Sequence, residues 1–331
     1  MIITQTPFRM SFFGGGTDLQ EFYEEHGGAV LSTTFDKYCY VNVRHLPHFF
    51  DYRNQVTYSR IERVSSVDEI QHPAVREAMK YLDMKDIIVT YDADLPARTG
   101  LGTSSSFAVG MLNAFYALKG KYVSKKQLAD DAIYLERTLC NEAGGLQDQI
   151  AASFGGLNRI NFNASGYEVR PVIISPERKL CLNNNLMLFF TGFARFSAEI
   201  QEDTKQHIGD KTKQLLEMKS LVDDAEKVLT SKYEDIDEFG RLLDYTWKLK
   251  RQTGSRISTD AIDMLYERAI KAGAKGGKLL GAGGGGFLLF YVEPDKQISV
   301  RNELSELLEV PFKFDNSGTQ VIYYSPEQLT D

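Results

Sequence analysis

The sequence has few cysteines and no long hydrophobic run. Three cysteines among 331 residues, far apart in the chain, exclude a disulfide framework and a cysteine-rich metal cluster, and they suit a reducing compartment. The longest apolar run, Phe287 to Val292, is far shorter than the roughly twenty residues that span a bilayer. The segment before Arg9 has neither the charge nor the length of a signal peptide. We therefore expect a cytoplasmic protein without a membrane partner.

The sequence also lacks an excess of positive charge and the common nucleotide-binding signatures. The chain carries 38 Lys and Arg against 45 Asp and Glu, a net charge of −7, with no basic block, which argues against a nucleic-acid partner. The five histidines have no metal-ligand spacing. No G-x-x-x-x-G-K-S/T is present, which excludes a Walker loop, and no G-x-G-x-x-G stands between a predicted strand and a predicted helix, which weakens a dinucleotide interpretation. The length favours about two domains.

What the sequence does have is glycine, gathered in three segments. One of them, Pro96 to Ser106, contains Gly100 and Gly102 and four consecutive hydroxyl residues, and apolar residues at helical spacing follow it. This pattern predicts a helix with one buried face that begins near Thr103 to Ser105. The N–H groups at such a start favour an anion, and the glycines let the backbone approach a phosphate. A plain loop followed by a Ser or Thr cap is the alternative.

Two further glycine-rich segments, Pro7 to Asp18 and Lys278 to Phe287, accompany this one. Three such segments in this order resemble the GHMP kinases, the family that includes galactokinase, homoserine kinase, mevalonate kinase and phosphomevalonate kinase. The resemblance covers nearly the whole chain. The residues that match the family are, in the first motif (Pro7 to Asp18), Pro7, Arg9, Gly14 and Asp18; in the ATP loop (Pro96 to Ser106), Pro96, Gly100, Leu101, Gly102 and Ser104; and in the third glycine segment (Lys278 to Phe287), Gly281 to Gly286.

The resemblance implies an α+β fold with two lobes. A ribosomal-S5-like N-terminal domain (1–185) would carry the ATP loop and the catalytic aspartate, and a ferredoxin-like C-terminal domain (186–331) would follow. The residue pattern by itself predicts a mixed sheet in the first half and helices on an antiparallel sheet in the second. The predicted strands are 38–43, 87–91, 186–191, 286–292 and 321–324, and the predicted helices, besides the one that begins near Thr103 to Ser105, are 19–25, 74–82, 125–139, 197–230, 236–250 and 259–272.

Within the family, one branch is more similar than the others. Gly14 to Asp18, Gly27 to Ser32, Asp36 to Tyr38 and Thr191 to Arg195 resemble the kinases of D-glycero-D-manno-heptose 7-phosphate. The resemblance implies ATP-dependent phosphorylation of the anomeric hydroxyl, giving the 1,7-bisphosphate for nucleotide-activated heptose synthesis. Two alternatives remain open: a kinase for another sugar, of the fucose or galactose type, and a sugar- and ATP-binding regulator without catalysis.

Catalytic roles also follow from the resemblance. Asp148, expected in the first turn of a helix, would be the base or would orient the acceptor hydroxyl. Arg9 would lie beside the transferring phosphoryl group or keep Asp148 charged. In the alternative interpretations, Asp148 only complements a helix dipole, and Arg9 forms an ion pair with Asp18 that locks the glycine loop.

The expected ligands are ATP, Mg²⁺ and a sugar phosphate, and the oligomeric state is open. ATP is expected to contact Pro96, Gly100, Leu101, Gly102, Thr103, Ser104, Ser105 and Ser106. The sugar is expected to contact Gly15, Gly16, Thr17 and Asp18, and our first candidate for a second substrate phosphate is Arg195, with Lys37 and Arg44 behind it.

Two further residues are assigned with alternatives. Ser104 and Glu136 are expected to hold Mg²⁺, which prefers hard oxygen ligands, whereas Glu136 would otherwise be a solvated partner on a surface helix. Gly281 to Gly286 are expected to let the backbone approach the ATP loop closely. Lys278 is interpreted as an ordinary surface lysine.

Overall fold

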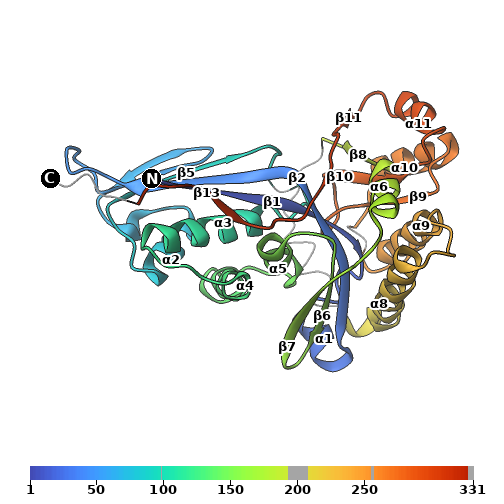
Figure 1. The fold of residues 1–331 in the computed structure, drawn as a ribbon, viewed down its shortest axis with the longest axis horizontal. Helices are drawn as coiled ribbons and strands as arrows, with labels where there is room; N and C mark the ends of the chain where they lie inside the picture. The colour runs from blue at the N-terminus through green and yellow to red at the C-terminus, as the bar shows by residue number, and fades with distance from the viewer. Residues whose placement is uncertain (98, 193–207, 255–256, 327–331) are drawn as a thin grey trace.

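Two β-sheets organise the computed structural model, which describes residues 1–97, 99–192, 208–254 and 257–326 (Figure 1). The larger sheet, with nine strands in these residues, comprises β1 (Ile2–Phe13), β2 (Gly28–His45), β3 (Asn54–Thr57), β4 (Ile61–Val64), β5 (Ile87–Ala93), β6 (Asn158–Asn163), β7 (Gly166–Pro171), β12 (Phe314–Asp315) and β13 (Gln320–Tyr324). The smaller sheet comprises β8 (Leu186–Phe190), β9 (Gly276–Leu279), β10 (Phe287–Tyr291) and β11 (Leu308–Glu309).

The helices are interspersed with the strands along the chain (Figure 1). In the first half of the chain the helices are α1 (Gln20–His26), α2 (Pro73–Tyr81), α3 (Thr103–Leu118), α4 (Lys125–Ile133), a π-helical continuation (Tyr134–Leu139), α5 (Gln147–Phe154) and α6 (Pro176–Asn184), with a 3₁₀ turn at Val67–Glu69. In the second half they are α8 (Ile208–Thr230), α9 (Glu238–Arg251), α10 (Asp260–Ala272) and α11 (Gln297–Glu303). Helix α6 contacts β8 of the smaller sheet, while α8 contacts β1 and β2 of the larger one. The mixture of helices with two sheets confirms the predicted α+β class.

The larger sheet is mixed, as the sequence predicts. Its main order is β13-β1-β2-β5-β3-β4, and β6 and β12 also pair with β2. Strand β3 runs parallel to β5, while the other pairs are antiparallel. In the β1–β2 pair, Arg9 lies opposite Thr34, so the strand that carries the arginine of the first motif is paired with β2 at this position. This pairing fixes the backbone from which Arg9 extends.

Helix α3 is more deeply buried than its pattern predicts. It begins at Thr103, as expected, but nearly its whole circumference is buried because it lies against β1 and β2 and also contacts α4 and α5. A helix that is apolar all round belongs in such a central position. Gly110 permits the close packing, since a Cβ there would stand 2.7 Å from the Thr6 hydroxyl oxygen. The start of α3 is therefore held rigidly.

The chain ends by returning to the first sheet. Strand β13 pairs with β1, where Ile2 faces Tyr324, and β12 pairs with β2. The strand predicted at 321–324 is present, yet it completes the larger sheet and not the smaller one, because the outer edge of β1 accepts it. The division at 185/186 stays a prediction, with the addition that residues 314–324 lie in the first sheet.

The smaller sheet is antiparallel throughout, in the order β11-β8-β10-β9, and Trp247, Tyr266 and Phe290 lie in its core. Helices cover it, as predicted for the second half of the chain. Of the helix predicted at 197–230, the part over 208–230 is α8, and the remainder lies outside the described residues.

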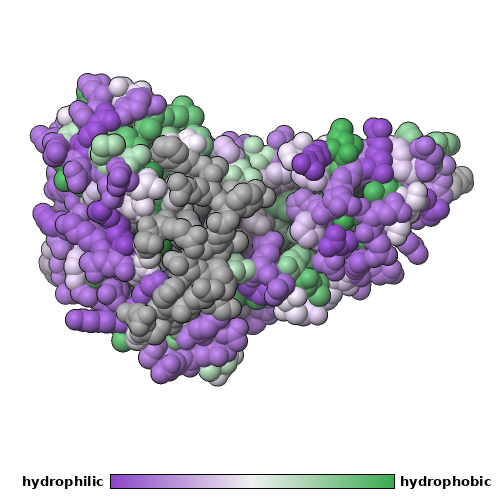
Figure 2. All heavy atoms as spheres, turned by 180° about the vertical axis from the view of Figure 1, so that it is seen from behind, coloured by the Kyte–Doolittle hydropathy of each residue, from purple (hydrophilic) through white to green (hydrophobic). Residues whose placement is uncertain are grey.

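Figure 2 shows one face of the molecule, on which hydrophilic residues cover most of the coloured surface and hydrophobic residues form small separate groups. Among the helices that the structure describes, none combines the length and the apolar character needed to cross a bilayer.

Candidate active site

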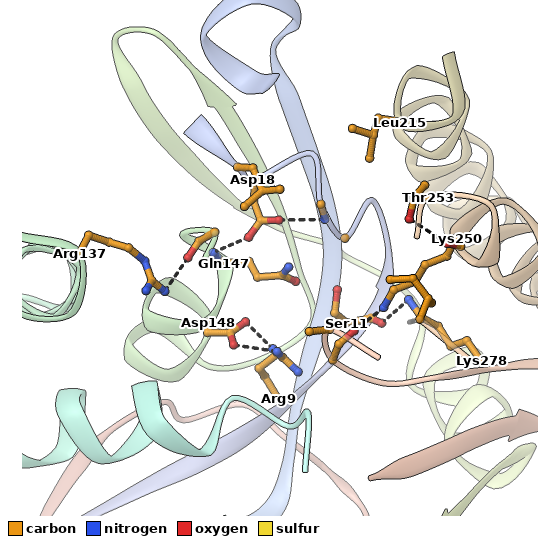
Figure 3. Close-up of a pocket in the computed structure, with 17 residues that line it drawn as sticks. Arg9, Ser11, Asp18, Arg137, Gln147, Asp148, Leu215, Lys250, Thr253 and Lys278 are labelled. Carbon is orange, nitrogen blue, oxygen red and sulfur yellow. Dashed lines mark hydrogen bonds and ion pairs between the residues drawn. The ribbon is translucent and has the colours of Figure 1, made fainter. Parts of the chain in front are cut away.

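A pocket lies where the two halves of the chain meet (Figure 3). Its lining comes from the end of β1 and the loop after it, the start of α5, the end of α9 and the third glycine segment. The predicted residues Arg9, Gly15, Gly16, Asp18 and Asp148 all line it. The fold thus brings the first motif and the predicted catalytic aspartate together.

The Arg9 guanidinium binds Asp148 through two hydrogen bonds. Its Nε and Nη2 each donate to a different carboxylate oxygen of Asp148 at 2.7 Å, and its Nη1 donates to the Gly100 carbonyl oxygen, also at 2.7 Å. Two-point binding of this kind is strong and fixes the plane of the carboxylate. Arg9 therefore pairs with Asp148. The alternative interpretation, in which Arg9 pairs with Asp18, is wrong. Arg9 also ties Asp148 to the ATP loop.

Asp148 lies in the first turn of α5, as predicted. The unpaired N–H groups and the positive end of the dipole favour a carboxylate at that position, so the helix supports its charge whatever its chemical role. The half-exposed Asp148 faces the pocket, in contrast to its buried partner Arg9. The carboxylate is thus both oriented and accessible.

Asp18 is held across the pocket by backbone groups. Its Oδ1 accepts a hydrogen bond from the Gly16 N–H at 3.0 Å and its Oδ2 one from the Gln147 N–H at 3.1 Å. Burial raises the pKa of Asp18, repulsion by Asp148 adds to the rise, and the backbone hydrogen bonds oppose it. A Cβ on Gly145 would stand 1.9 Å from Asp18 Oδ2, so only glycine fits beside this carboxylate.

Thr17 lies in the interior of the loop. Its side chain is fully buried, donates to the Gly14 and Ala29 carbonyl oxygens at 2.8 and 2.9 Å, and accepts from the Ala29 N–H at 3.1 Å. Thr17 is absent from the pocket lining. The structure therefore gives it a place in the framework of the glycine loop, since its hydroxyl is already committed to the backbone.

The ATP loop and the third glycine segment touch each other. A Cβ on Gly100 would stand 2.4 Å from the Leu280 carbonyl oxygen, and one on Gly281 would stand 2.2 Å from the Gly100 Cα. Gly100 and Gly102 also have positive φ angles of 81° and 73°, which favour glycine. The expected close approach of the third segment to the ATP loop is confirmed.

The other residues predicted for ATP surround the start of α3. Gly102 is the residue before the helix and Thr103 to Ser105 form its first turn, where N–H groups lack intrahelical partners. The Leu101 carbonyl accepts the Arg9 N–H at 3.1 Å, and the Ser106 hydroxyl donates to the Pro7 carbonyl at 3.0 Å. Pro96 accepts a hydrogen bond from the Thr99 hydroxyl at 2.9 Å. First motif and ATP loop are thereby joined.

Glu136 is buried, so its interpretation as a solvated surface residue is wrong. It lies in the π-helical turn after α4, and its carboxylate accepts hydrogen bonds from the Ser104 hydroxyl at 3.1 Å, from the Ser105 hydroxyl at 2.7 Å and from the Gln149 side chain. A carboxylate and a hydroxyl at a helix start are hard oxygen donors that fit Mg²⁺. The described residues contain no group of three His, Cys, Asp or Glu that would hold a metal by themselves, so phosphates and water would supply the other ligands.

Two lysines at the site were missed by sequence reasoning. Lys278 is buried in β9 and donates to the Ser11 and Phe12 carbonyl oxygens at 2.9 and 2.8 Å, so its interpretation as a surface lysine is wrong. Lys250, near the end of α9, donates to the Gly281 carbonyl oxygen. A signal existed for it, because Lys250 follows Leu243 and Trp247 on the buried stripe of α9.

A fourth basic residue at the pocket, Arg137, orders the loop before α5. Its guanidinium donates to the carbonyl oxygens of Glu142, Ala143 and Gly145 at 3.0 to 3.2 Å. Of the candidates for a second substrate phosphate, Arg195 lies outside the described residues, and Lys37 and Arg44 are not part of the pocket lining.

Comparison with known proteins places this arrangement in a family. Residues 70–156 match the GHMP kinases N terminal domain and residues 221–310 the GHMP kinases C terminal domain. The chain is 31% identical over 317 residues to a D-glycero-alpha-D-manno-heptose 7-phosphate kinase of Campylobacter jejuni, covering 90% of this chain and 91% of that protein. It is 28% identical to an L-fucokinase/L-fucose-1-P guanylyltransferase of Bacteroides fragilis, covering 90% of this chain and 35% of that protein.

A solved structure shares the fold. The D-glycero-D-manno-heptose 1-phosphate kinase from Bacteroides thetaiotaomicron superposes with a TM-score of 0.80 at 24% identity, covering 98% of this chain and all of that one. The two domain matches and the relative that is similar along nearly the full length agree with the three glycine segments and with the contacts of Gly100 with Arg9 and Gly281. The chain therefore belongs to the GHMP kinase family and is an ATP-dependent kinase.

Proposed function

We propose that this kinase transfers the terminal phosphoryl group of ATP to the anomeric hydroxyl of D-glycero-D-manno-heptose 7-phosphate. The product would be the 1,7-bisphosphate, used in nucleotide-activated heptose biosynthesis. The observation that carries the proposal is the Arg9–Asp148 pair, which lies in one pocket with Asp18 and is bonded to the ATP loop at Gly100. The heptose as acceptor is supported by the Campylobacter jejuni relative.

Asp148 accepts the proton of the attacking hydroxyl in this mechanism. Phosphoryl transfer needs chiefly positioning and neutralisation of charge, and a placed base helps the hydroxyl to attack. Arg9 holds the Asp148 carboxylate in one orientation and couples it to Gly100, so base and phosphate cradle keep a fixed distance. Asp18 accepts hydrogen bonds from sugar hydroxyls, and the backbone N–H groups of Gly15 and Gly16 border the same space.

The phosphates of ATP bind at the start of α3, because the first turn of a helix offers N–H donors that have no partner within the helix, and the positive end of its dipole favours an anion. Gly100 and Gly102 let the backbone come close. Ser104 and Glu136 would hold Mg²⁺ through a hydroxyl and a carboxylate oxygen 3.1 Å apart. When bound with ATP, the ion neutralises charge on the phosphates.

The test is ADP release with Mg·ATP against the heptose 7-phosphate, fucose, galactose and mannose in parallel, with phosphorus NMR of the product. We expect an anomeric phosphate on the heptose, with turnover at least about tenfold faster than on any unphosphorylated sugar, since a site built for a polar group discriminates strongly against its absence. Equal or faster turnover of an unphosphorylated hexose would overturn the heptose assignment.

A fucose-type kinase is the second candidate, because the chain is also 28% identical to a protein with an L-fucokinase name. Turnover of fucose alone in the same panel would support it. Binding of ATP and sugar without turnover would instead favour a regulator, against which the Arg9–Asp148 pair and the buried Glu136 argue.

A further inference from the structure

More positive than negative charge gathers at the pocket. Arg9, Arg137, Lys250 and Lys278 line it together with two acids, Asp18 and Asp148. Burial, Lys250 and Arg9 lower the pKa of Lys278 well below its usual value, so the other three side chains carry the positive charge. Lys250 and Lys278 stand side by side in Figure 3. Asp148 is taken up by Arg9, and Asp18 by two backbone N–H groups. Buried charges are costly unless an opposite charge compensates them, so this excess of cations suits a negatively charged ligand.

Lys250 is the cation in this group with the fewest protein bonds. Its ammonium group has three N–H donors, and in the described structure it donates to one neutral acceptor, the Gly281 carbonyl oxygen. Lys278 by contrast spans two carbonyl oxygens, of Ser11 and Phe12, and is only 2% exposed. Burial and the nearby Arg9 lower the pKa of Lys250 to about 8, while Asp18 opposes that fall.

Two further polar atoms at the pocket lack a partner in the described structure. The Ser11 hydroxyl is buried and the Gln147 side-chain oxygen is shielded, and neither makes a hydrogen bond within the residues described. Both residues line the pocket with Lys250. Buried polar atoms are rarely left unsatisfied in folded proteins, so their presence here points to a polar ligand.

We propose that Lys250 binds a phosphate oxygen of a bound substrate in this pocket, with Ser11 as a neighbouring hydrogen-bond partner. Lys250 donates a hydrogen bond to the Gly281 carbonyl oxygen, and Gly281 lies against Gly100 of the ATP loop. Arg9 donates a hydrogen bond to the carbonyl oxygen of Gly100 itself. The two cations therefore flank the junction of the glycine segments. The phosphate oxygen that Lys250 binds belongs either to the phosphoryl group in transfer or to a phosphate carried by the acceptor sugar. The inference rests on the proposed function only for the second of these sources.

Two variants separate the charge of Lys250 from its hydrogen bond to the Gly281 carbonyl oxygen. Lys250→Met removes the charge and the hydrogen bond, and Lys250→Gln removes the charge but keeps a donor for the Gly281 carbonyl. Lys248→Met is the matched control, because Lys248 is on the same helix, is exposed and pairs with Asp244. We expect both Lys250 variants to melt no lower than the wild type, since removing an uncompensated buried charge is often neutral or stabilising.

The first readout does not require kinase activity. Tripolyphosphate and inorganic phosphate should raise the melting temperature of the wild type and of Lys248→Met, and this shift should be lost in both Lys250 variants. The second readout is kcat/KM, expected to fall about 10- to 100-fold in both Lys250 variants, the usual loss when a charged hydrogen-bond donor is removed.

The acceptor identifies the source of the phosphate. An equal fall with phosphorylated and unphosphorylated sugars assigns Lys250 to the phosphoryl group in transfer, and a fall with the phosphorylated sugar alone assigns it to the acceptor's phosphate. Wild-type behaviour of Lys250→Gln in both readouts would overturn the proposal and leave Lys250 as an anchor of Gly281. If no sugar is turned over, the proposed function fails while the phosphate-induced shift still tests this inference.

Discussion

Gly281 lies against Gly100 so closely that a Cβ on Gly281 would stand 2.2 Å from the Gly100 Cα. The two residues are 181 positions apart in the chain, one in the ATP loop and one in the third glycine segment. This contact between backbones joins the two halves of the molecule at the pocket, beside Arg9 and Lys250.

Gly100→Ala should destabilise the protein and weaken ATP binding. The new Cβ would stand 2.4 Å from the Leu280 carbonyl oxygen at a φ of +81°. Gly120→Ala is the control, because Gly120 has a φ of +67° and a Cβ there would meet no heavy atom within 4 Å. We expect Gly100→Ala to lower the free energy of unfolding by about 1–3 kcal/mol more than Gly120→Ala, the usual cost of overpacking. Equal losses in denaturant titrations would contradict the tight contact.

Asp148→Asn should spare ATP affinity while lowering turnover by roughly two to four orders of magnitude, the usual worth of general acid–base help. The amide keeps the size of the carboxylate but cannot take up a proton, and it donates where Arg9 also donates. The measurement is kcat together with ATP binding by calorimetry. Near-normal turnover would place the base elsewhere and leave Asp148 as a complement to the α5 dipole.

Glu136→Gln should raise the Mg²⁺ concentration needed for half-maximal activity by about tenfold, since a neutral amide is a poorer ligand for a hard cation. Glu142→Gln, at a nearby carboxylate not assigned to the metal, serves as the control. Magnesium titrations of ADP release, and of the melting temperature with ADP present, measure the effect. An unchanged Mg²⁺ requirement would reduce Glu136 to a hydrogen-bond partner of Ser104 and Ser105.

The value of kcat/KM should fall as the pH rises through about 8, because Lys250 loses its proton there and only the charged form attracts a phosphate. The charged groups that act on it are Arg9 of β1 and Asp18 of the following loop, while the neighbouring Lys278 of β9 has its own pKa lowered well below its usual value by burial, by Lys250 and by Arg9. A bound phosphate favours the ammonium form, so the corresponding fall in kcat should lie at higher pH. Lys250→Gln should lack the fall in kcat/KM, and its persistence there would assign the titration to another group.

Much of the site was predictable because its chemistry is local in sequence. The start of α3 at Thr103 and the place of Asp148 in a first helical turn follow from residue spacing and from the glycines that precede each helix. Resemblance to the family supplied the assignment of Arg9. These features depend on a few neighbouring residues, which a pattern captures.

Other features required the folded chain. The sequence by itself determined the family, the α+β class and the glycine segments, since these are set by residue order and local backbone preference. Only the tertiary structure decided that Arg9 pairs with Asp148 instead of Asp18, that Lys278 is buried and that Lys250 reaches the pocket. The partners of a charged side chain depend on which distant segments fold against it, and here β1, α5, α9 and the third glycine segment converge on one point.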